Sequence, residues 1–347
     1  SIDNSLLDQE IFLTFLLGLN IIDWASFSGV IIFQALMFSV GIQFNKKLIN
    51  ISAITVYVGM IIFFFVVFLS DAKVTSKAFI NILDFKNFLD INNLVPLLTV
   101  AGTIFTYFSI IILSFGDYSR YVKDEKSLKK GNLSLILNLI IFSFFAVFIV
   151  IGSDTFLNQK FEDLDRIFTN PTDIIGKFDN LQITIIVLFF IIVASASTNL
   201  VANFIPSQYS LINFIPSKLT LKSASYIISI VGFLIGIFWL TFLSQIGILS
   251  FIDTFGAFFG PLFGVIIVDY YLIKKSSLSN KDIYSVEADS VYYYSKGWHI
   301  KALYSLIIGF TFSASTIWNI NLMFLQSYAW IIGAIVSSIT YYLLAKR

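Results

Sequence analysis

The sequence predicts an all-α membrane protein whose helices cross the bilayer several times. Hydrophobic residues make up 57% of the chain and charged residues only 12%, whereas a soluble domain carries about 25% charged residues. Nine apolar stretches follow one another, each near the roughly 20 residues that a helix needs to span a bilayer. They lie near residues 24–44, 50–70, 95–115, 133–153, 181–205, 223–243, 247–273, 300–318 and 322–344. No linker separates them, so we expect a single transmembrane domain over residues 1–347.

The composition also excludes several classes of function. A formal net charge of +1 gives no electrostatic reason to bind nucleic acid. The chain has no cysteine and a single histidine, His299, which excludes thiolate chemistry and paired-histidine metal sites. His299 follows Trp298 at the start of a predicted helix, where a position at the membrane interface is expected. We therefore expect neither an enzyme nor a cofactor.

The distribution of charge predicts the orientation in the membrane. Most Lys and Arg residues lie in the odd-numbered connections, above all residues 116–132 and 274–301, and at the C-terminus. The connection over residues 154–180 is instead rich in Asp and Glu. Because basic connections stay in the cytoplasm, we expect a cytoplasmic C-terminus in the inner (plasma) membrane and an external position for Ser1.

The start of the chain is unusual for such an orientation. Residues 1–23 have no Met, no basic residue and no signal-peptide pattern. A chain that begins outside without these features is expected to continue upstream. We interpret it as the C-terminal portion of a longer protein, with an odd number of spans before Ser1.

The fifth stretch becomes polar where the helix is deep in lipid. Residues 183–193 are almost entirely apolar, and five polar residues follow in close succession: Ser195, Ser197, Thr198, Asn199 and Asn203. Uncharged polar groups in lipid are costly unless they find partners. A neighbouring helix, water, an ion or a ligand must therefore meet this segment.

Two interpretations of this polar segment stay open. Ala194, Ser197 and Thr198 share one helix face, and two hydroxyls beside a freed carbonyl would offer oxygen ligands to a hard cation such as sodium. Small and hydroxyl side chains are, however, also common where membrane helices pack closely. Asn203 lies about 120° from Ser197 around an ideal helix, so spacing alone does not place both in one pocket.

The third stretch carries a second polar interruption. Gly102, Thr103 and Thr106 break its apolar run, as in a helix that is interrupted around a binding site. A packing notch for a neighbouring helix explains the glycine equally well. Beyond the stretch, Asp117 and Arg120 are three residues apart at a helix end, where either an ion pair or a contact with lipid headgroups is expected.

The seventh stretch combines a glycine stripe with an acid. Gly256, Gly260 and Gly264 recur every four residues, which gives a smooth face for a close neighbour. Pro261 is expected to kink this helix. Asp253 is an intramembrane acid and hence a functional candidate, although an outer position in contact with water is the simpler expectation.

Together these motifs resemble the nucleobase:cation symporter-1 family, which includes permeases for cytosine and purines, uracil, hydantoins, allantoin and thiamine. Residues 116–121 are similar to the family's Asp-aromatic-Ser-Arg-Tyr signature at the end of its sixth helix. Residues 194–211 are similar to its eighth helix, residues 260–271 to its tenth, and residues 282–298 to the loop that follows. The resemblance covers nearly the whole chain in order.

The resemblance implies an architecture. The family has twelve helices in a five-plus-five inverted-repeat (LeuT-type) fold. This chain would supply helices four to twelve, and the three missing helices would precede it as upstream partners in the same protein. Their odd number agrees with the orientation inferred from charge.

The resemblance also implies a cation site. In sodium-coupled members the ion is held by oxygens of the eighth helix. These oxygens map onto the carbonyl of Ala194 and the hydroxyls of Ser197 and Thr198. A hydroxyl pair also serves proton-coupled relatives, so either sodium or a proton is expected as the coupling ion.

The implied substrate site combines two helices. The substrate-binding Asn of the family's eighth helix maps onto Asn203. The aromatic residue of its sixth helix, usually Trp, falls at Phe108, with Tyr107 next to it. Phe108 keeps a π-face but lacks a ring N–H, so the resemblance leaves the identity of the substrate open.

The function implied by the resemblance is cation-coupled secondary transport. Such a protein would import a nucleobase or related heterocycle across the lipid bilayer by alternating access. A non-transporting receptor or a channel on the same helices is the alternative. Accumulation of substrate against its gradient, abolished by an ionophore, would distinguish them.

Overall fold

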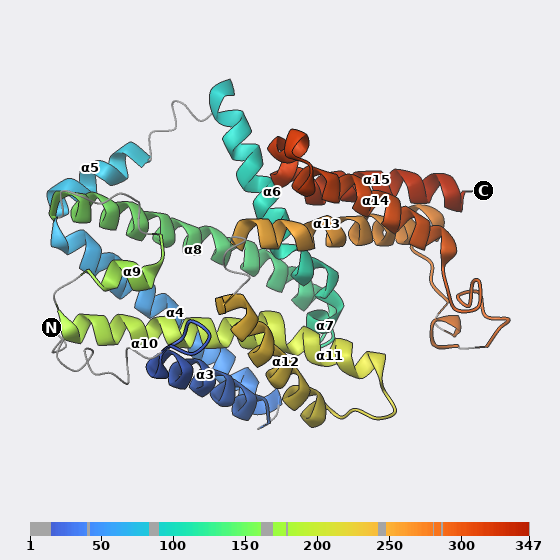
Figure 1. Cartoon of the computed structure of the whole chain (residues 1–347), viewed down its shortest axis with the longest axis horizontal. Coiled ribbons are helices and arrows are strands. Elements are labelled where there is room, and N and C mark those ends of the chain that lie inside the picture. Colours follow the sequence, from blue (N-terminus) through green and yellow to red (C-terminus); the bar gives the residue numbers. More distant parts are fainter. Residues whose placement is uncertain are drawn as a thin grey trace. The chain divides into compact units, whose positions relative to one another are not determined.

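The computed structural model describes residues 15–39, 42–82, 90–160, 169–177, 180–241, 248–279, 281–285 and 287–346. The described residues are overwhelmingly helical (Figure 1). The chain divides into two compact units, one over residues 1–86 and 117–241, the other over residues 87–116 and 242–347. Each unit therefore combines segments from distant parts of the sequence. The expectation of one transmembrane domain stays a prediction.

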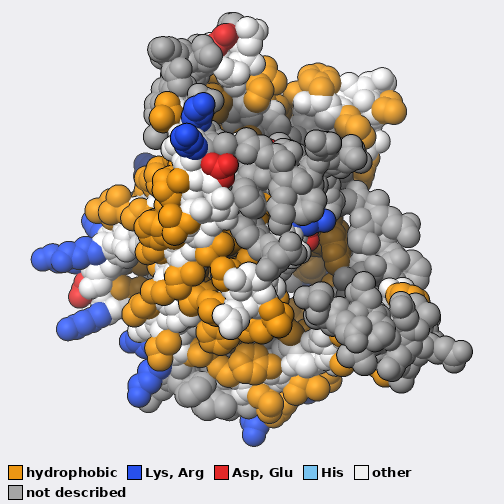
Figure 2. Space-filling model, turned by 90° about the vertical axis from the view of Figure 1, so that its left-hand side faces the viewer, with side chains coloured by type: hydrophobic (Ala, Val, Ile, Leu, Met, Phe, Trp, Pro, Cys, Tyr) orange, Lys and Arg blue, Asp and Glu red, His pale blue; other side chains and the backbone are white. Residues whose placement is uncertain are grey.

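The helices have the length and apolarity that a bilayer requires. Among the described residues, eight helical stretches can cross a membrane by length and composition, and Ile21–Met37 is a shorter apolar helix. Each stretch predicted from the sequence overlaps a described helix. Large hydrophobic side chains remain exposed on them, as on the helix over Glu125–Lys160, where Leu133 is 59% and Ile140 is 62% exposed. Figure 2 shows such side chains spread over one face of the molecule, as expected of helices that face lipid.

The first unit is built around three long helices. Its elements are α3 (Ile21–Ser39), α4 (Ile42–Ser70), α5 (Ala72–Ile82), α8 (Glu125–Lys160), α9 (Pro171–Ile175), α10 (Leu181–Asn199), η2 (Leu200–Phe204), α11 (Ile205–Phe214) and α12 (Leu221–Thr241). Helix α4 packs against both α8 and α10, while α3 packs against α12. Val67, Leu157 and Val187 are almost fully buried where α4, α8 and α10 meet. This core supports α10, which carries the predicted cation ligands.

The second unit is a bundle of four long helices with irregular ends. Its elements are α6 (Ile91–Leu113), α13 (Ile248–Ile267), η4 (Val268–Ile273), η5 (Asp282–Tyr284), α14 (Ile300–Trp318), η6 (Ile320–Tyr328) and α15 (Ala329–Ala345). Helices α13, α14 and α15 pack on one another, and α6 packs on α13. The short helix α7 (Phe115–Ser119) contains the boundary between the two units.

The glycine stripe of α13 allows the close packing that the sequence predicts. A Cβ atom at Gly256 would lie 2.3 Å from the Thr106 methyl group on α6. At Gly260 and Gly264 it would lie 2.2 and 2.3 Å from backbone carbonyl oxygens of α15, those of Trp330 and Ala334. These separations are too short for any side chain, so glycine is required at all three contacts.

Helix α6 decides between the two interpretations of Gly102. One was a helix interrupted around a binding site, but α6 is continuous from Ile91 to Leu113. Gly102 is instead a packing notch, because its Cβ would lie 2.0 Å from the Ser327 carbonyl oxygen of η6. The glycine therefore permits backbone contact between α6 and η6, and no break in α6 is needed.

Candidate ion- and substrate-binding site

The polar segment of the first unit coincides with a change of helix type. Helix α10 ends at Asn199, and the π-helical segment η2 joins it to α11. The backbone N–H of Ile205 bonds to the Leu200 carbonyl, five residues back. Short π-helical segments inside α-helices frequently mark functional sites. The irregularity thus begins at Leu200, beyond the predicted cation ligands.

The Ala202 carbonyl in this segment accepts a hydrogen bond from a side chain, and Pro206 explains why. Proline has no backbone N–H, so it cannot bond to the carbonyl four residues earlier, that of Ala202. The Tyr118 hydroxyl donates to this oxygen instead, over 3.2 Å. Burial, and then the negative charge of Asp117, raise the pKa of Tyr118, so the phenol keeps its proton at neutral pH.

A cluster next to Tyr118 ties the same region to α11. Arg120 donates to Asp117 over 2.9 Å, which confirms the predicted ion pair. The Arg120 guanidinium also lies 4.3 Å from the ring centre of Tyr209 on α11. The Tyr121 and Tyr209 hydroxyls are hydrogen-bonded to each other. Burial, followed by this bond, raises the pKa of Tyr121.

Two of the three predicted cation ligands are neighbours in the structure. The Ser197 hydroxyl donates to the Ala194 carbonyl over 3.1 Å, so these two oxygens lie together on α10. Thr198 is exposed and Ser197 is half-buried. Because the Ser197 hydroxyl bonds within its own helix, this bond does not use it to hold a second helix. Coordination of a cation by these residues stays a prediction.

Asn203 belongs to a chain of amides that the sequence analysis missed. Its side-chain nitrogen donates to the Asn199 oxygen over 2.7 Å. The Asn199 nitrogen in turn donates to the Gln34 oxygen on α3, also over 2.7 Å. Gln34 is only 7% exposed, so the chain starts from a buried anchor and fixes the orientation of the exposed Asn203 side chain. The sequence feature that could have revealed this chain of amides is Gln34, an amide within the apolar run of α3.

The predicted substrate aromatics lie on α6 in the second unit. The rings of Tyr107 and Phe108 meet edge to face, with centres 5.3 Å apart. Tyr107 is 61% exposed and Phe108 is half-buried. These two side chains thus lie together, whereas Asn203 and the predicted cation ligands belong to the first unit. A substrate site shared by the two groups stays a prediction.

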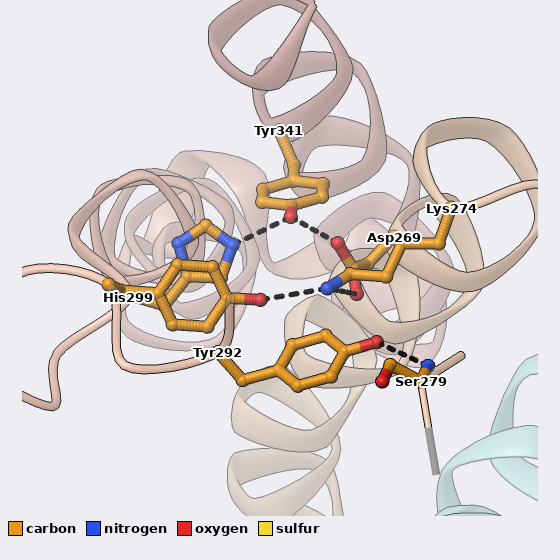
Figure 3. A network of polar contacts seen from close by, with 7 residues as sticks. Asp269, Lys274, Ser279, Tyr292, His299 and Tyr341 are labelled. Carbon is orange, nitrogen blue, oxygen red and sulfur yellow. Dashed lines mark hydrogen bonds and ion pairs between the residues drawn. The ribbon is translucent and has the colours of Figure 1, made fainter. Parts of the chain in front are cut away.

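The second unit also contains a polar network that no sequence prediction joined together (Figure 3). The Tyr341 hydroxyl donates to Asp269 over 2.6 Å, and His299 Nε2 lies 2.8 Å from the same hydroxyl. Lys274 Nζ donates to the Tyr294 hydroxyl over 3.0 Å and lies 4.0 Å from Asp269. These residues border a cavity of about 320 Å³ at the ends of η4, α14 and α15. The network thus links η4, α14 and α15.

His299 is therefore more than the interfacial residue expected from the sequence. Its ring stacks on Tyr294 with centres 3.9 Å apart. The single Tyr341 proton goes to Asp269, so His299 must donate its own Nε2 proton to Tyr341. Burial lowers the pKa of His299, although the charge of Asp269 opposes this shift. The imidazole is thus a neutral structural donor at neutral pH.

Asp253 on α13 is buried, whereas the sequence predicted an outer position in contact with water. Its side chain is 4% exposed. One carboxyl oxygen accepts from Gln326 Nε2 of η6 over 2.8 Å. Within the described part of the chain, Oδ1 has no hydrogen-bond partner. The expectation of an outer, hydrated acid was wrong because the carboxyl is buried and bonded to Gln326, a long-range contact that hydropathy cannot reveal.

These features define a multi-pass, all-α membrane protein with the helices of a transporter scaffold. Residues 12–343 match the family of permeases for cytosine/purines, uracil, thiamine and allantoin. The chain belongs to this family, which confirms the resemblance found in the sequence.

Individual relatives agree with this membership. The chain is 26% identical over 204 residues to the purine-uracil permease of Arabidopsis thaliana, covering 59% of this chain and 33% of that protein. It is 26% identical over 237 residues to the allantoin permease of Bacillus subtilis, and this match covers 68% of this chain and 46% of that protein. The chain thus spans a third to a half of these relatives. Both are named permeases, in line with the expectation that the chain is not an enzyme.

A solved structure shows the fold. Mhp1, a nucleobase-cation-symport-1 family transporter in a closed conformation with bromovinylhydantoin bound, matches with a TM-score of 0.50. The match covers 93% of this chain and 83% of that one, at 16% sequence identity. The predicted all-α transporter fold is confirmed.

Proposed function

We propose that this chain forms part of a cation-coupled secondary transporter that imports a nucleobase or related flat heterocycle by alternating access. Family membership and permease relatives support the class of activity. The observation that carries the proposal is the junction of α10 and η2, where oxygen ligands and an oriented amide occur within ten residues of one membrane helix.

Sodium is the cation that we assign to this junction. Its ligands would be the Ala194 carbonyl and the hydroxyls of Ser197 and Thr198, because hard cations prefer oxygen. The residues that we assign to the heterocycle are Asn203 and the aromatic pair Tyr107–Phe108. Asn203 supplies amide hydrogen bonds, and the rings supply π-faces. Upstream helices of the full-length protein would complete both sites.

Coupling follows if sodium stabilises the outward-facing state that binds the heterocycle. Two ligands that favour the same state raise each other's affinity by the same factor. The transporter would lie in the inner (plasma) membrane with its C-terminus in the cytoplasm, as the basic connections favour.

The test uses the full-length protein in proteoliposomes and radiolabelled uracil, allantoin and hydantoin as probes. Replacing Ser197 and Thr198 together by Ala should abolish the sodium dependence of uptake. Ser195→Ala is the matched control, because Ser195 is an exposed hydroxyl on the same helix that the proposed cation site does not use. Unchanged sodium dependence in the double variant would remove this cation site.

The same assay separates transport from the alternative of a channel or receptor. A secondary transporter accumulates the probe above its external concentration, and an ionophore abolishes that accumulation. Equilibration without accumulation would identify a channel, and binding without entry would identify a receptor.

A further inference from the structure

The second unit contains a buried acid that the proposed sodium site does not use. Asp253 is the only acidic residue between Phe251 and Ile267. Its carboxyl accepts one hydrogen bond, from Gln326, and its Oδ1 is buried without a hydrogen-bond partner. Among the residues that the structure describes, no basic side chain forms an ion pair with it.

This environment does not suit a negative charge. Moving an ionised carboxylate out of water costs several kcal/mol, and one amide donor compensates little of that cost. A protonated carboxyl avoids the charge and also gains an O–H donor. The buried state of Asp253 is therefore the neutral, protonated one.

A second buried oxygen, on α6, faces the side of α13 that carries Asp253. Among the described residues, Thr106 Oγ1 has no hydrogen-bond partner, and it would lie 3.0 Å from a Cβ at Gly256, three residues after Asp253. Residues three apart share a helix face. Two buried oxygens without partners thus lie along one face of α13, inside an otherwise apolar bundle.

The residue that bonds to Asp253 lies on a segment suited to movement. Gln326 belongs to η6, a 3₁₀ helix of nine residues, whereas such helices rarely exceed three or four residues. Long 3₁₀ stretches often mark hinges or strained segments. Displacement of η6 would remove the Gln326 bond and admit water to the carboxyl, which favours its ionised form.

Helix η6 also contacts the helix that carries the predicted substrate aromatics. Gly102 of α6 meets the Ser327 carbonyl with no room for a side chain. The Thr99 hydroxyl lies 3.4 Å from the Tyr328 hydroxyl. A shift of α6 around Tyr107 and Phe108 would therefore be transmitted to η6, and from there to Asp253.

We propose that the Asp253 carboxyl is a proton-binding site, which takes a proton from water when η6 is displaced and holds it while Gln326 is bonded to it. A carboxylate oxygen takes up the proton from water on one side of the membrane and releases it to water on the other side, so each transport cycle carries one positive charge across. The role of Asp253 in coupling rests on the proposed transport function. The proton would be a second coupling ion, besides the sodium ion assigned to α10.

The transport test compares two assays on the full-length protein in proteoliposomes, with radiolabelled uracil, allantoin and hydantoin. One assay measures accumulation driven by an imposed proton gradient, and the other measures exchange of probe across the membrane without a gradient. Asp253→Asn mimics the protonated acid, so it should lose proton-driven accumulation and keep exchange. Glu125→Gln, an exposed carboxyl on α8, should keep both.

Three outcomes would overturn the proposal. The first is proton-driven accumulation that survives in Asp253→Asn. The second is a wild type that accumulates probe with a sodium gradient but never with a proton gradient, which would leave the proposed function intact. The third is loss of exchange in a correctly folded Asp253→Asn variant, because the neutral state should support exchange.

An infrared spectrum of the same protein at neutral pH tests the site without transport. The wild type should show the C=O stretching band of a protonated carboxyl, and Asp253→Asn should lack this band while Glu125→Gln retains it. If no probe is transported under any gradient, the proposed function fails, and this band alone decides whether the proton site exists. A wild type and an Asp253→Asn variant with identical carboxyl bands would overturn it.

Discussion

The Tyr341 hydroxyl donates a hydrogen bond of 2.6 Å to Asp269, and this bond joins α15 to the end of η4 (Figure 3). Tyr341 is 1% exposed, so its side chain is packed inside the second unit. Asp269 has one further charged neighbour, Lys274 at 4.0 Å. The bond therefore holds together two segments of the second unit, α15 and η4.

Removing this hydroxyl should destabilise the protein. We expect Tyr341→Phe to lower the free energy of unfolding by about 1–3 kcal/mol, because it leaves polar groups without their partner in a buried position. Thermal unfolding of the full-length protein in detergent would measure the loss as a lower midpoint. Tyr342→Phe is the matched control on the same helix. An equal midpoint for Tyr341→Phe and wild type would show that this bond adds no stability.

His299 should make stability depend on pH, because burial lowers its pKa in the folded protein. The unfolded chain keeps the ordinary value of about 6.5, so it binds more protons than the folded protein just below that pH. Stability is then fully present above about pH 6.5 and is lost as the pH falls through the lower pKa of the folded state.

Thermal midpoints measured between pH 7.5 and pH 5 would reveal this loss. His299→Gln keeps an N–H donor for Tyr341 but cannot titrate, so its midpoint should fall less over the same range. His299 is the only histidine of the chain, so the difference between the two profiles belongs to this residue. Parallel profiles for the two proteins would contradict the assigned shift.

The sequence revealed the features that depend on local pattern. The spans follow from apolar length, and the close contacts of Gly256 and Gly260 follow from their spacing. The polar segment around Ser197 stood out because the residues before it are apolar. These predictions need no knowledge of distant partners.

The features that the sequence could not reveal depend on long-range contacts. Gln34 and Asn199 are 165 residues apart, and Asp253 and Gln326 are 73 residues apart. Hydropathy places each of these residues in a helix but cannot say which helix lies next to it. The same limit explains why Asp253 was expected in water.

Tyr118 and Pro206 should be energetically coupled, because the Tyr118 hydroxyl donates to the Ala202 carbonyl, to which proline at position 206 cannot donate an α-helical hydrogen bond. In Tyr118→Phe the Ala202 carbonyl loses its side-chain donor, and unfolding should become easier by about 1–3 kcal/mol. In Pro206→Ala the new backbone N–H can bond to Ala202, as in a regular α-helix. Tyr118→Phe should therefore lower the free energy of unfolding by less in the Pro206→Ala background than in the wild type.

A double-mutant cycle on thermal or denaturant unfolding measures this coupling, which we expect at about 0.5–3 kcal/mol for residues that share one partner. Tyr226→Phe on α12 is the control, because Tyr226 is exposed and its effect should be the same in both backgrounds. Additive effects of Tyr118→Phe and Pro206→Ala would show that proline does not create the need for the tyrosine. The π-helical segment η2 would then require another cause.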